Sequence, residues 1–299
     1  MPIESKPAAD LDVDSALVRA LLHEQHRDLA DLPLSYVAAG WDNHLFRLGD
    51  SLAVRLPRRA LASNLTVHEH RWLPLLAARL PLPIPVPVRT GHPGCGFPWS
   101  WSIVPWLDGT SAAAAPLPDP ALNAVDLGLF LRALHQPAPA DAPTNPWRGV
   151  PLAERTRSVL ERTKQLSDRV DSARIVAVWN KIVATPCWPG PPLWLHGDLH
   201  PGNLLIRGAR IAAVLDFGDL TSGDPATDLS IAWMGLPPSA RPGFRASARN
   251  AFNPIDEDTW VRARGWALTL GLAYLAGSRD DPLLEAIGQT AIHAVLNDD

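Results

Sequence analysis

The sequence contains very little lysine. Only Lys6, Lys164 and Lys181 stand against 24 arginines, while acidic residues leave the chain at a modest net charge of −4. No block of like charge interrupts the chain. This balance argues against nucleic acid or an anionic membrane surface as the partner.

Cysteines and long apolar runs are scarce as well. Cys95 and Cys187 stand in unrelated contexts and form no Cys-x-x-Cys pair, which is typical of a reducing compartment and indicates no disulfide. No run approaches the roughly 18 apolar residues of a membrane span. Residues 1–14 lack the charged start and apolar stretch of a signal peptide. We therefore expect a cytoplasmic protein.

The pattern of the chain changes near Asp108. Before this point, a helical pattern covers residues 15–30 and includes Leu29, and three β-type runs occupy 34–40, 44–48 and 51–56. A helix over 64–80 and a strand over 97–107 complete the segment. Gly49-Asp50 predicts a hairpin between the last two runs. After Asp108, helical patterns predominate, at about 121–136, 152–168, 172–184, 240–252, 257–277 and 281–296, and short β runs lie between Leu193 and Phe217. The sequence predicts an α+β protein with a strand-rich lobe over 1–107 and a helical lobe over 108–299.

Polar residues with a chemical pattern occur in LHGDLHPGNLLI, residues 195–206. Asp198 lies in this segment, Asn203 follows, and Asp216 comes thirteen residues later within LDFGD. Phosphoryl transfer needs a carboxylate that orients the acceptor hydroxyl and takes its proton, and oxygen ligands for Mg²⁺ such as a carboxylate and an amide carbonyl. Asp198 fits the first role, and Asn203 and Asp216 fit the second.

Two other interpretations of this segment remain open. His196, Asp198 and His200 alternate, and alternate side chains of a strand point the same way, so one alternative is a metal cage of these three residues. Such a site would need further ligands, and the sequence offers Asn203 and Asp-Phe-Gly instead. The other alternative is that the segment is a polar structural loop in a catalytically inactive module.

HGDLHPGN followed by LDFGD resembles the aminoglycoside phosphotransferase family, which has a bilobal protein-kinase-like fold. RLPRRA, EHRWLPLLAARLPLPIPVPV and WSIVPWLDG resemble members of the family too, so the resemblance covers roughly residues 35–235. It implies that residues 1–107 bind the nucleotide and that 108–299 carry the catalytic loop and acceptor pocket. It also implies that His196 braces the catalytic loop and that Asp228 anchors it. For His200, a place near the transferring phosphate and a bond to the backbone remain equally open.

The nucleotide side departs from the common kinase pattern. A strand lysine paired with a helix glutamate usually holds the phosphates, but SLAVRLP presents Arg55 at this place and no lysine is near. Macrolide phosphotransferases and some aminoglycoside kinases resemble this chain in having arginine there. Arginine still binds phosphate, with a different shape, so the donor is expected to be ATP or GTP. Glu69 is the candidate partner of Arg55.

Two further segments are candidates for nucleotide contacts. AAGWDNHLF, with Gly40 and Asn43, is expected to form the turn over the phosphates, although an ordinary hairpin turn has the same pattern. In IVPWL, the Pro105 carbonyl and the Leu107 N–H are expected to bind the purine edge. Trp106 between them is interpreted as a packing residue.

The acceptor is the least determined partner. The resemblance implies a small hydroxylated molecule, most readily an antibiotic, with an aminoglycoside ahead of a macrolide. From Pro254 onward, the sequence has eight acidic residues and three arginines, a local net charge of −5 that suits a cationic acceptor. Acidic residues are also typical of helix caps and first helical turns. The aromatic residues Trp260, Trp266 and Tyr274 are expected in the core, or else as a pocket wall. A metabolic kinase for a choline-, homoserine- or sugar-like acceptor, or a nucleotide-binding pseudokinase, remains an alternative.

Overall fold

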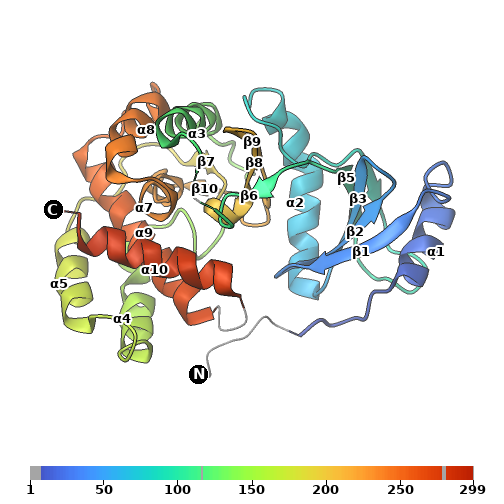
Figure 1. The fold of residues 1–299 in the computed structure, drawn as a ribbon, viewed down its shortest axis with the longest axis horizontal. Helices are drawn as coiled ribbons and strands as arrows, with labels where there is room; N and C mark the ends of the chain where they lie inside the picture. Colours follow the sequence, from blue (N-terminus) through green and yellow to red (C-terminus); the bar gives the residue numbers. More distant parts are fainter. Residues whose placement is uncertain (1–7, 116, 278–280, 299) are drawn as a thin grey trace. The chain divides into compact units, whose positions relative to one another are not determined.

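The computed structural model describes residues 8–115, 117–277 and 281–298. These residues form two compact units, one of residues 8–79 and 83–108 and the other of residues 80–82 together with the described residues from Gly109 onward (Figure 1). Among the described residues, none of the helices has both the length and the apolar character needed to cross a bilayer.

The first unit is built on a five-stranded antiparallel sheet. Its strands, in the order β1-β2-β3-β5-β4, are β1 (Leu34–Ala39), β2 (Asn43–Leu48), β3 (Leu52–Pro57), β5 (Trp101–Pro105) and β4 (Arg89–Gly91). The predicted hairpin joins β2 and β3, and Gly49 has a φ of 59° in its turn. Glycine adopts this left-handed conformation without steric cost, which explains the turn.

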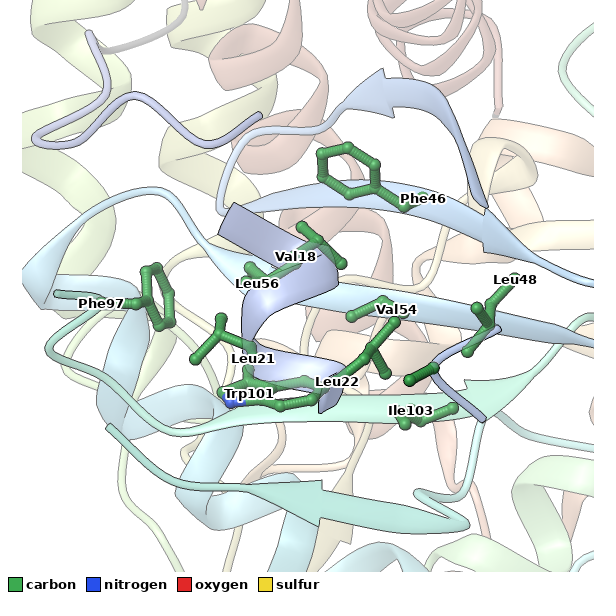
Figure 2. Packing of buried hydrophobic residues seen from close by; sticks show 11 residues of the cluster. Val18, Leu21, Leu22, Phe46, Leu48, Val54, Leu56, Phe97, Trp101 and Ile103 are labelled. Carbon is green, nitrogen blue, oxygen red and sulfur yellow. The ribbon is translucent and has the colours of Figure 1, made fainter. Parts of the chain in front are cut away.

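Helix α1 (Ser15–Gln25) covers one face of this sheet. The Asp14 side chain caps it by accepting a hydrogen bond from the Leu17 N–H at 2.8 Å. The helix and the sheet share a core of fully buried side chains (Figure 2), formed by Val18, Leu21, Leu22, Ala30, Phe46, Leu48, Val54, Leu56, Phe97, Trp101 and Ile103. Each large apolar side chain buried there stabilises the unit by roughly 1.5–3 kcal/mol. The helix ends at Gln25, so Leu29, which the helical pattern included, packs on the core from the following turn.

Helix α2 (Ala60–Ala77) contacts the opposite face of the sheet. Side chains alternate along a strand, so Val54 and Leu56 join the core with α1 while Arg55 points to the other side. There it meets Glu69 of α2. The helix continues through Pro74.

The second unit is mainly helical. Its α-helices are α3 (Pro120–Leu134), α4 (Thr156–Gln165), α5 (Ser172–Ile182), α6 (Ala226–Leu229), α7 (Ile231–Gly235), α8 (Arg241–Ala248), α9 (Glu257–Gly277) and α10 (Pro282–Leu296). Helix α9 is buried over most of its surface and packs against α4, α5, α6, α7 and α10. A helix that is apolar on most sides belongs in the interior, and Trp266 of α9 is fully buried there, as expected for a core residue.

Short strands in this unit position the two signature segments. Strand β7 (Leu193–Leu195) pairs with β10 (Thr221–Gly223), and β8 (Leu204–Arg207) lies between β6 (Thr110–Ser111) and β9 (Arg210–Val214). Strand β7 leads into the HGD segment, β8 begins directly after Asn203, and β9 ends two residues before Asp216.

Candidate active site

The loop that follows β7, which is the candidate catalytic loop, is anchored by Asp228. Its carboxylate accepts hydrogen bonds from the backbone N–H groups of His196 at 2.8 Å and Gly197 at 2.9 Å. It also meets the Nε2 atom of His135 at 3.2 Å, and both side chains are fully buried. A buried carboxylate requires such partners. The predicted anchoring role of Asp228 is therefore confirmed.

Gly197 allows the two signature segments to touch. Its φ of 87° lies in the left-handed region, and a Cβ atom built on it would lie 2.2 Å from the carbonyl oxygen of Asp219. A real Cβ atom cannot approach an oxygen so closely, so the loop before Asp198 requires glycine at this position.

Asn203 and the chain before Asp216 are tied to the catalytic loop. The Asn203 side-chain amide donates to the backbone carbonyl of Asp198 at 2.9 Å, and the backbone carbonyl of Asn203 accepts from the Leu215 N–H at 2.8 Å. The Leu215 carbonyl in turn lies 2.8 Å from Nε2 of His196. His196 therefore braces the loop, as expected. Asp198, Asn203 and Leu215, the residue directly before Asp216, therefore belong to one hydrogen-bonded assembly.

The donor atoms at this place fit a hard cation. The side chain of Asp216 is exposed, and the residue has a φ of 57°, a conformation that costs an L-residue roughly 1–2 kcal/mol and that marks functional sites. Within the described part of the chain, the side-chain oxygen of Asn203 accepts no hydrogen bond. A carboxylate and a carboxamide oxygen are ligands that suit Mg²⁺, which keeps water and phosphate oxygens in its other positions.

The alternative metal cage of His196, Asp198 and His200 is not formed. Nε2 of His196 faces the Leu215 carbonyl, and Nδ1 accepts from the Asp198 N–H at 3.3 Å, so both ring nitrogens are used. Among the residues that the structure describes, no group of three or more His, Cys, Asp or Glu side chains is arranged to hold a metal ion. The side chains of the strand-like alternation therefore serve different purposes.

The Asp198 carboxylate has three close neighbours. Its Oδ1 atom lies 3.1 Å from Nη2 of Arg148 and 2.7 Å from the Tyr274 hydroxyl, while its Oδ2 atom lies 3.6 Å from Nε2 of His200. Burial raises the pKa of Asp198, but His200, Arg148 and Tyr274 together outweigh it and hold that pKa well below its usual range. Asp198 is thus a carboxylate at neutral pH, as a proton acceptor must be.

His200 has a defined role in this loop. Its Nδ1 atom accepts from the Gly202 N–H at 3.0 Å, which caps the short 3-10 turn Pro201–Asn203. Because Nδ1 is an acceptor, the hydrogen-bond network assigns the proton of the neutral ring to Nε2, facing Asp198. The predicted bond to the backbone is observed, and the place near the transferring phosphate stays a prediction.

A second carboxylate, Asp219, joins the site through Arg148. Its Oδ2 atom lies 3.6 Å from Nη2 of Arg148, and its Oδ1 atom accepts from the Asn145 amide at 2.6 Å. Burial and the nearby charges of Asp198 and Asp216 raise the pKa of Asp219, in spite of Arg148. Burial lowers the pKa of Arg148, but Asp219 and Asp198 more than compensate, so that it is raised.

The predicted nucleotide residues lie in the other unit. Nη1 of Arg55 lies 3.2 and 3.0 Å from the two carboxylate oxygens of Glu69, and the side chains are 12% and 4% exposed. The expected ion pair is therefore present, with arginine where kinases commonly have lysine.

The turn from Gly40 to Asn43 is held by an arginine. The Gly40 N–H donates to the Asn43 carbonyl at 2.8 Å, and Nη1 of Arg58 donates to the carbonyls of Gly40 at 3.1 Å and Trp41 at 3.2 Å. The following residue, Arg59, pairs with Asp42. The RLPRRA motif thus has a structural partner in this turn, which the sequence did not indicate.

The segment that is expected to bind the purine edge spans the end of β5. Pro105 lies opposite Leu52 of β3, and the Trp106 N–H donates to the Ser51 carbonyl at 2.8 Å. Within the described residues, the Leu107 N–H donates no backbone hydrogen bond. The partly exposed Trp106 ring stacks under the guanidinium of Arg47, 4.0 Å away, so it does pack within this unit.

Comparison with known proteins identifies the family. The model of the phosphotransferase enzyme family, APH, matches residues 33–266. The chain belongs to this family. No curated protein matches the sequence of this phosphotransferase.

Solved structures share its fold. The GDP complex of wild-type aminoglycoside 2'-phosphotransferase-IIIa is 17% identical, with a TM-score of 0.67 over 96% of this chain and 100% of that one. The macrolide 2'-phosphotransferase MphH from Brachybacterium faecium is 24% identical, with a TM-score of 0.61 over 94% and 98% of the two chains. The predicted protein-kinase-like α+β fold is thereby confirmed.

The acidic C-terminal stretch of this phosphotransferase is mostly used within the fold. Asp256 and Asp281 cap helices, and Glu257, Glu285 and Asp298 pair with arginines. Arg279, Asp280 and Asp299, which contributed to the predicted local charge, lie outside the described residues. Caps and ion pairs therefore account for most of the acidic residues that had suggested a cationic acceptor.

The aromatic residues of α9 divide between two roles. Trp266 is buried, and Trp260 stacks at 4.7 Å on Trp233, so both belong to the packing of this unit. Tyr274 instead reaches Asp198 with its hydroxyl. Sequence reasoning identified neither this contact nor those of Arg148, Asn145 and Asp219.

Proposed function

We propose that this phosphotransferase moves the γ-phosphoryl group of ATP or GTP to a hydroxyl of a small molecule. One observation carries the proposal: Asp198, Asn203 and the chain before Asp216 form a single hydrogen-bonded assembly. The necessary groups for orienting a hydroxyl and for holding a divalent cation are thus adjacent. Residues 1–107 would serve as the nucleotide lobe, and 108–299 as the catalytic and acceptor lobe.

Asp198 would act as the base. The acceptor oxygen attacks the γ-phosphorus, and the bond between the γ-phosphorus and the β–γ bridging oxygen breaks. The hydroxyl proton passes to Asp198, and the products are a phosphorylated acceptor and a nucleoside diphosphate. Asn203 and Asp216 would hold Mg²⁺, which when bound neutralises charge on the transferring phosphates. The low pKa of Asp198 keeps the side chain ionised, so that it can accept a hydrogen bond from the acceptor hydroxyl and orient it.

The donor would be held by residues of the sheet unit. Arg55, kept in place by Glu69, would contact the phosphates, and the Gly40–Asn43 turn would cover them with backbone N–H groups. The open N–H of Leu107 and the carbonyl of Pro105 would bind the purine edge. These residues fit ATP and GTP alike, which is why both donors belong in the test.

An antibiotic is the proposed acceptor, with an aminoglycoside tested ahead of a macrolide. Support comes from the relatives, which include a GDP and kanamycin complex, a streptomycin and ATP complex, and the macrolide enzyme MphH. Two carboxylates, Asp198 and Asp219, lie beside the single guanidinium of Arg148, a balance that would favour a cationic acceptor. A cytoplasmic location would supply the nucleotide and keep Cys95 and Cys187 as the free thiols observed.

The proposal is tested by nucleotide consumption. Purified protein with Mg²⁺ and either ATP or GTP is offered aminoglycosides, macrolides and small alcohols, and the released diphosphate is measured. We expect acceptor-dependent release that falls at least about 100-fold in Asp198→Asn, with nucleotide binding retained. Asp126→Asn, which removes an aspartate paired with Arg210, is the matched control.

The other outcomes would replace the proposal. Turnover with small alcohols alone would make the protein a metabolic kinase. Nucleotide binding without turnover across the whole panel would make it a pseudokinase.

A further inference from the structure

The segment from Asn145 to Gly149 is fixed by hydrogen bonds between Gly149 and two residues, Asp224 and Thr227, which directly precede Asp228 or lie close to it in the chain. The Gly149 N–H donates to the Thr227 hydroxyl at 3.1 Å, and the Gly149 carbonyl accepts from the Asp224 N–H at 2.9 Å. Gly149 has a φ of 69°, and a Cβ atom there would lie 2.8 Å from a Leu195 methyl carbon. Arg148 is therefore attached to backbone that cannot easily move.

From this backbone, the Arg148 side chain connects two carboxylates. Its Nη2 atom lies 3.1 Å from Oδ1 of Asp198 and 3.6 Å from Oδ2 of Asp219, and the side chain is only 17% exposed. Asn145, three residues earlier, donates to the other oxygen of Asp219. One short segment thus contacts both the catalytic aspartate and the residue that follows Asp-Phe-Gly.

The two oxygens of Asp198 are treated differently. Oδ1 accepts from Arg148 and from the buried Tyr274 hydroxyl at 2.7 Å. Within the described residues, no hydrogen bond of 3.5 Å or less reaches Oδ2, and Nε2 of His200 lies 3.6 Å from it, a longer contact than either donor makes to Oδ1. A carboxylate oxygen with two donors has little capacity left, so Oδ2 is the oxygen available to an incoming hydroxyl.

We propose that Arg148 is a positioning residue for phosphoryl transfer, which with Tyr274 fixes Oδ1 of Asp198 so that Oδ2 receives the acceptor hydroxyl. This inference rests on the proposed function. Misplacement of a reacting group by about 1 Å can cost roughly 100-fold in rate, so the orientation of this carboxylate is worth fixing with two donors. Arginine suits the task because a planar guanidinium can contact two carboxylates at once, whereas an ammonium is a point charge.

The test compares four single variants and one double variant with the wild type in the acceptor-dependent assay. Arg148→Met removes the charge and both contacts, Arg148→Lys keeps the charge, and Tyr274→Phe removes the second donor. Arg155→Met is the matched control, since Arg155 is another buried arginine in the same unit and hydrogen-bonds Ser158 at 3.1 Å instead of a catalytic group. For each variant, kcat, the KM of nucleotide and acceptor, and the unfolding temperature are measured.

We expect Arg148→Met to lower kcat about 100-fold while the nucleotide KM stays within about twofold. Arg148→Lys should recover roughly tenfold of that loss, and Tyr274→Phe should lower kcat about tenfold. The double variant Arg148→Met/Tyr274→Phe should lose less than the product of the single losses, because both donors serve one oxygen. Arg155→Met should keep kcat within about twofold of the wild type, whatever its effect on stability.

Each result supports or overturns the inference. A wild type without turnover would refute the proposed function, and this inference with it. If the wild type turns over, a wild-type kcat in Arg148→Met, or an equal loss in Arg155→Met, would refute the positioning role alone. If Arg148→Met fails to fold, Tyr274→Phe and Arg148→Lys still test the inference. An unchanged kcat in both variants would overturn it. A fall in kcat without a rise in nucleotide KM would support it.

Discussion

Asp228 offers the sharpest test of how the active site is assembled. Its carboxylate is fully buried and accepts from the backbone of His196 at 2.8 Å and of Gly197 at 2.9 Å, with His135 as a third partner. In Asp228→Asn, one oxygen survives while the other becomes an NH₂ group that cannot accept. A hydrogen bond to a charged group is worth about 1.5–3 kcal/mol. Losing one such bond and weakening the other should lower the free energy of unfolding by roughly 2–4 kcal/mol.

The effect is measured by urea unfolding together with kcat. With a denaturant dependence of about 3 kcal/mol per molar urea, the midpoint should fall by roughly 1 M. The value of kcat should fall as well, because the two anchored residues directly precede Asp198. Ser230→Ala is the control: its buried hydroxyl donates to the Thr227 carbonyl at 2.6 Å, and its loss should cost about 1 kcal/mol without changing kcat. An Asp228→Asn protein as stable as Ser230→Ala, or one with wild-type kcat, would refute this reasoning.

Three further outcomes are expected. Asp216→Asn should raise the Mg²⁺ concentration for half-maximal activity about tenfold or more, in a titration at saturating nucleotide, because a neutral amide binds a hard cation less well than a carboxylate. Arg55→Met should raise the nucleotide KM about tenfold and destabilise the sheet unit by roughly 3 kcal/mol in thermal unfolding, because Glu69, only 4% exposed, loses its ion pair with Arg55. Burial lowers the pKa of His70 below its ordinary 6.5, so the unfolded chain binds a proton at this histidine more readily than the folded protein does. The neutral His70 ring therefore contributes fully to the free energy of unfolding above about pH 6.5, and this contribution is lost as the pH falls. His70→Gln should therefore lose less unfolding free energy than the wild type between about pH 7.5 and 5.

Local patterns were sufficient to predict most of the fold. The hairpin at Gly49-Asp50 and the long helices beyond Asp108 follow from turn chemistry and apolar spacing, which neighbouring residues determine. The strands β6 and β10 were not predicted, because they contain two and three residues and depend on pairing with distant segments. Helix α1 was predicted too long, since its apolar pattern continues past Gln25 although the chain turns there.

The same distinction applies to the active site. Asp198, Asn203 and Asp216 were found because they occur within 19 residues and in a recognisable order. Arg148 and Tyr274 lie 50 and 76 positions from Asp198 in sequence, and only the tertiary fold brings them to its carboxylate. One signal was present for Arg148: it lies beside Gly149, in a loop segment whose rigidity depends on a left-handed glycine.

The high ratio of arginine to lysine has a structural explanation, because several arginines in this protein each bind two or more acceptors at once. Arg148 lies between two carboxylates, Arg58 holds two carbonyls of the Gly40–Asn43 turn, and Arg262 binds Asp224 as well as the Pro186 carbonyl. A guanidinium presents five N–H donors in a fixed plane and can satisfy such sets, whereas an ammonium is a single charge centre on a flexible stem. Arg55 in place of the usual lysine is then consistent with the rest of the chain, because one of its nitrogens contacts both oxygens of Glu69. Lysine at this position would keep the charge but would have fewer donors to divide between the glutamate and the nucleotide.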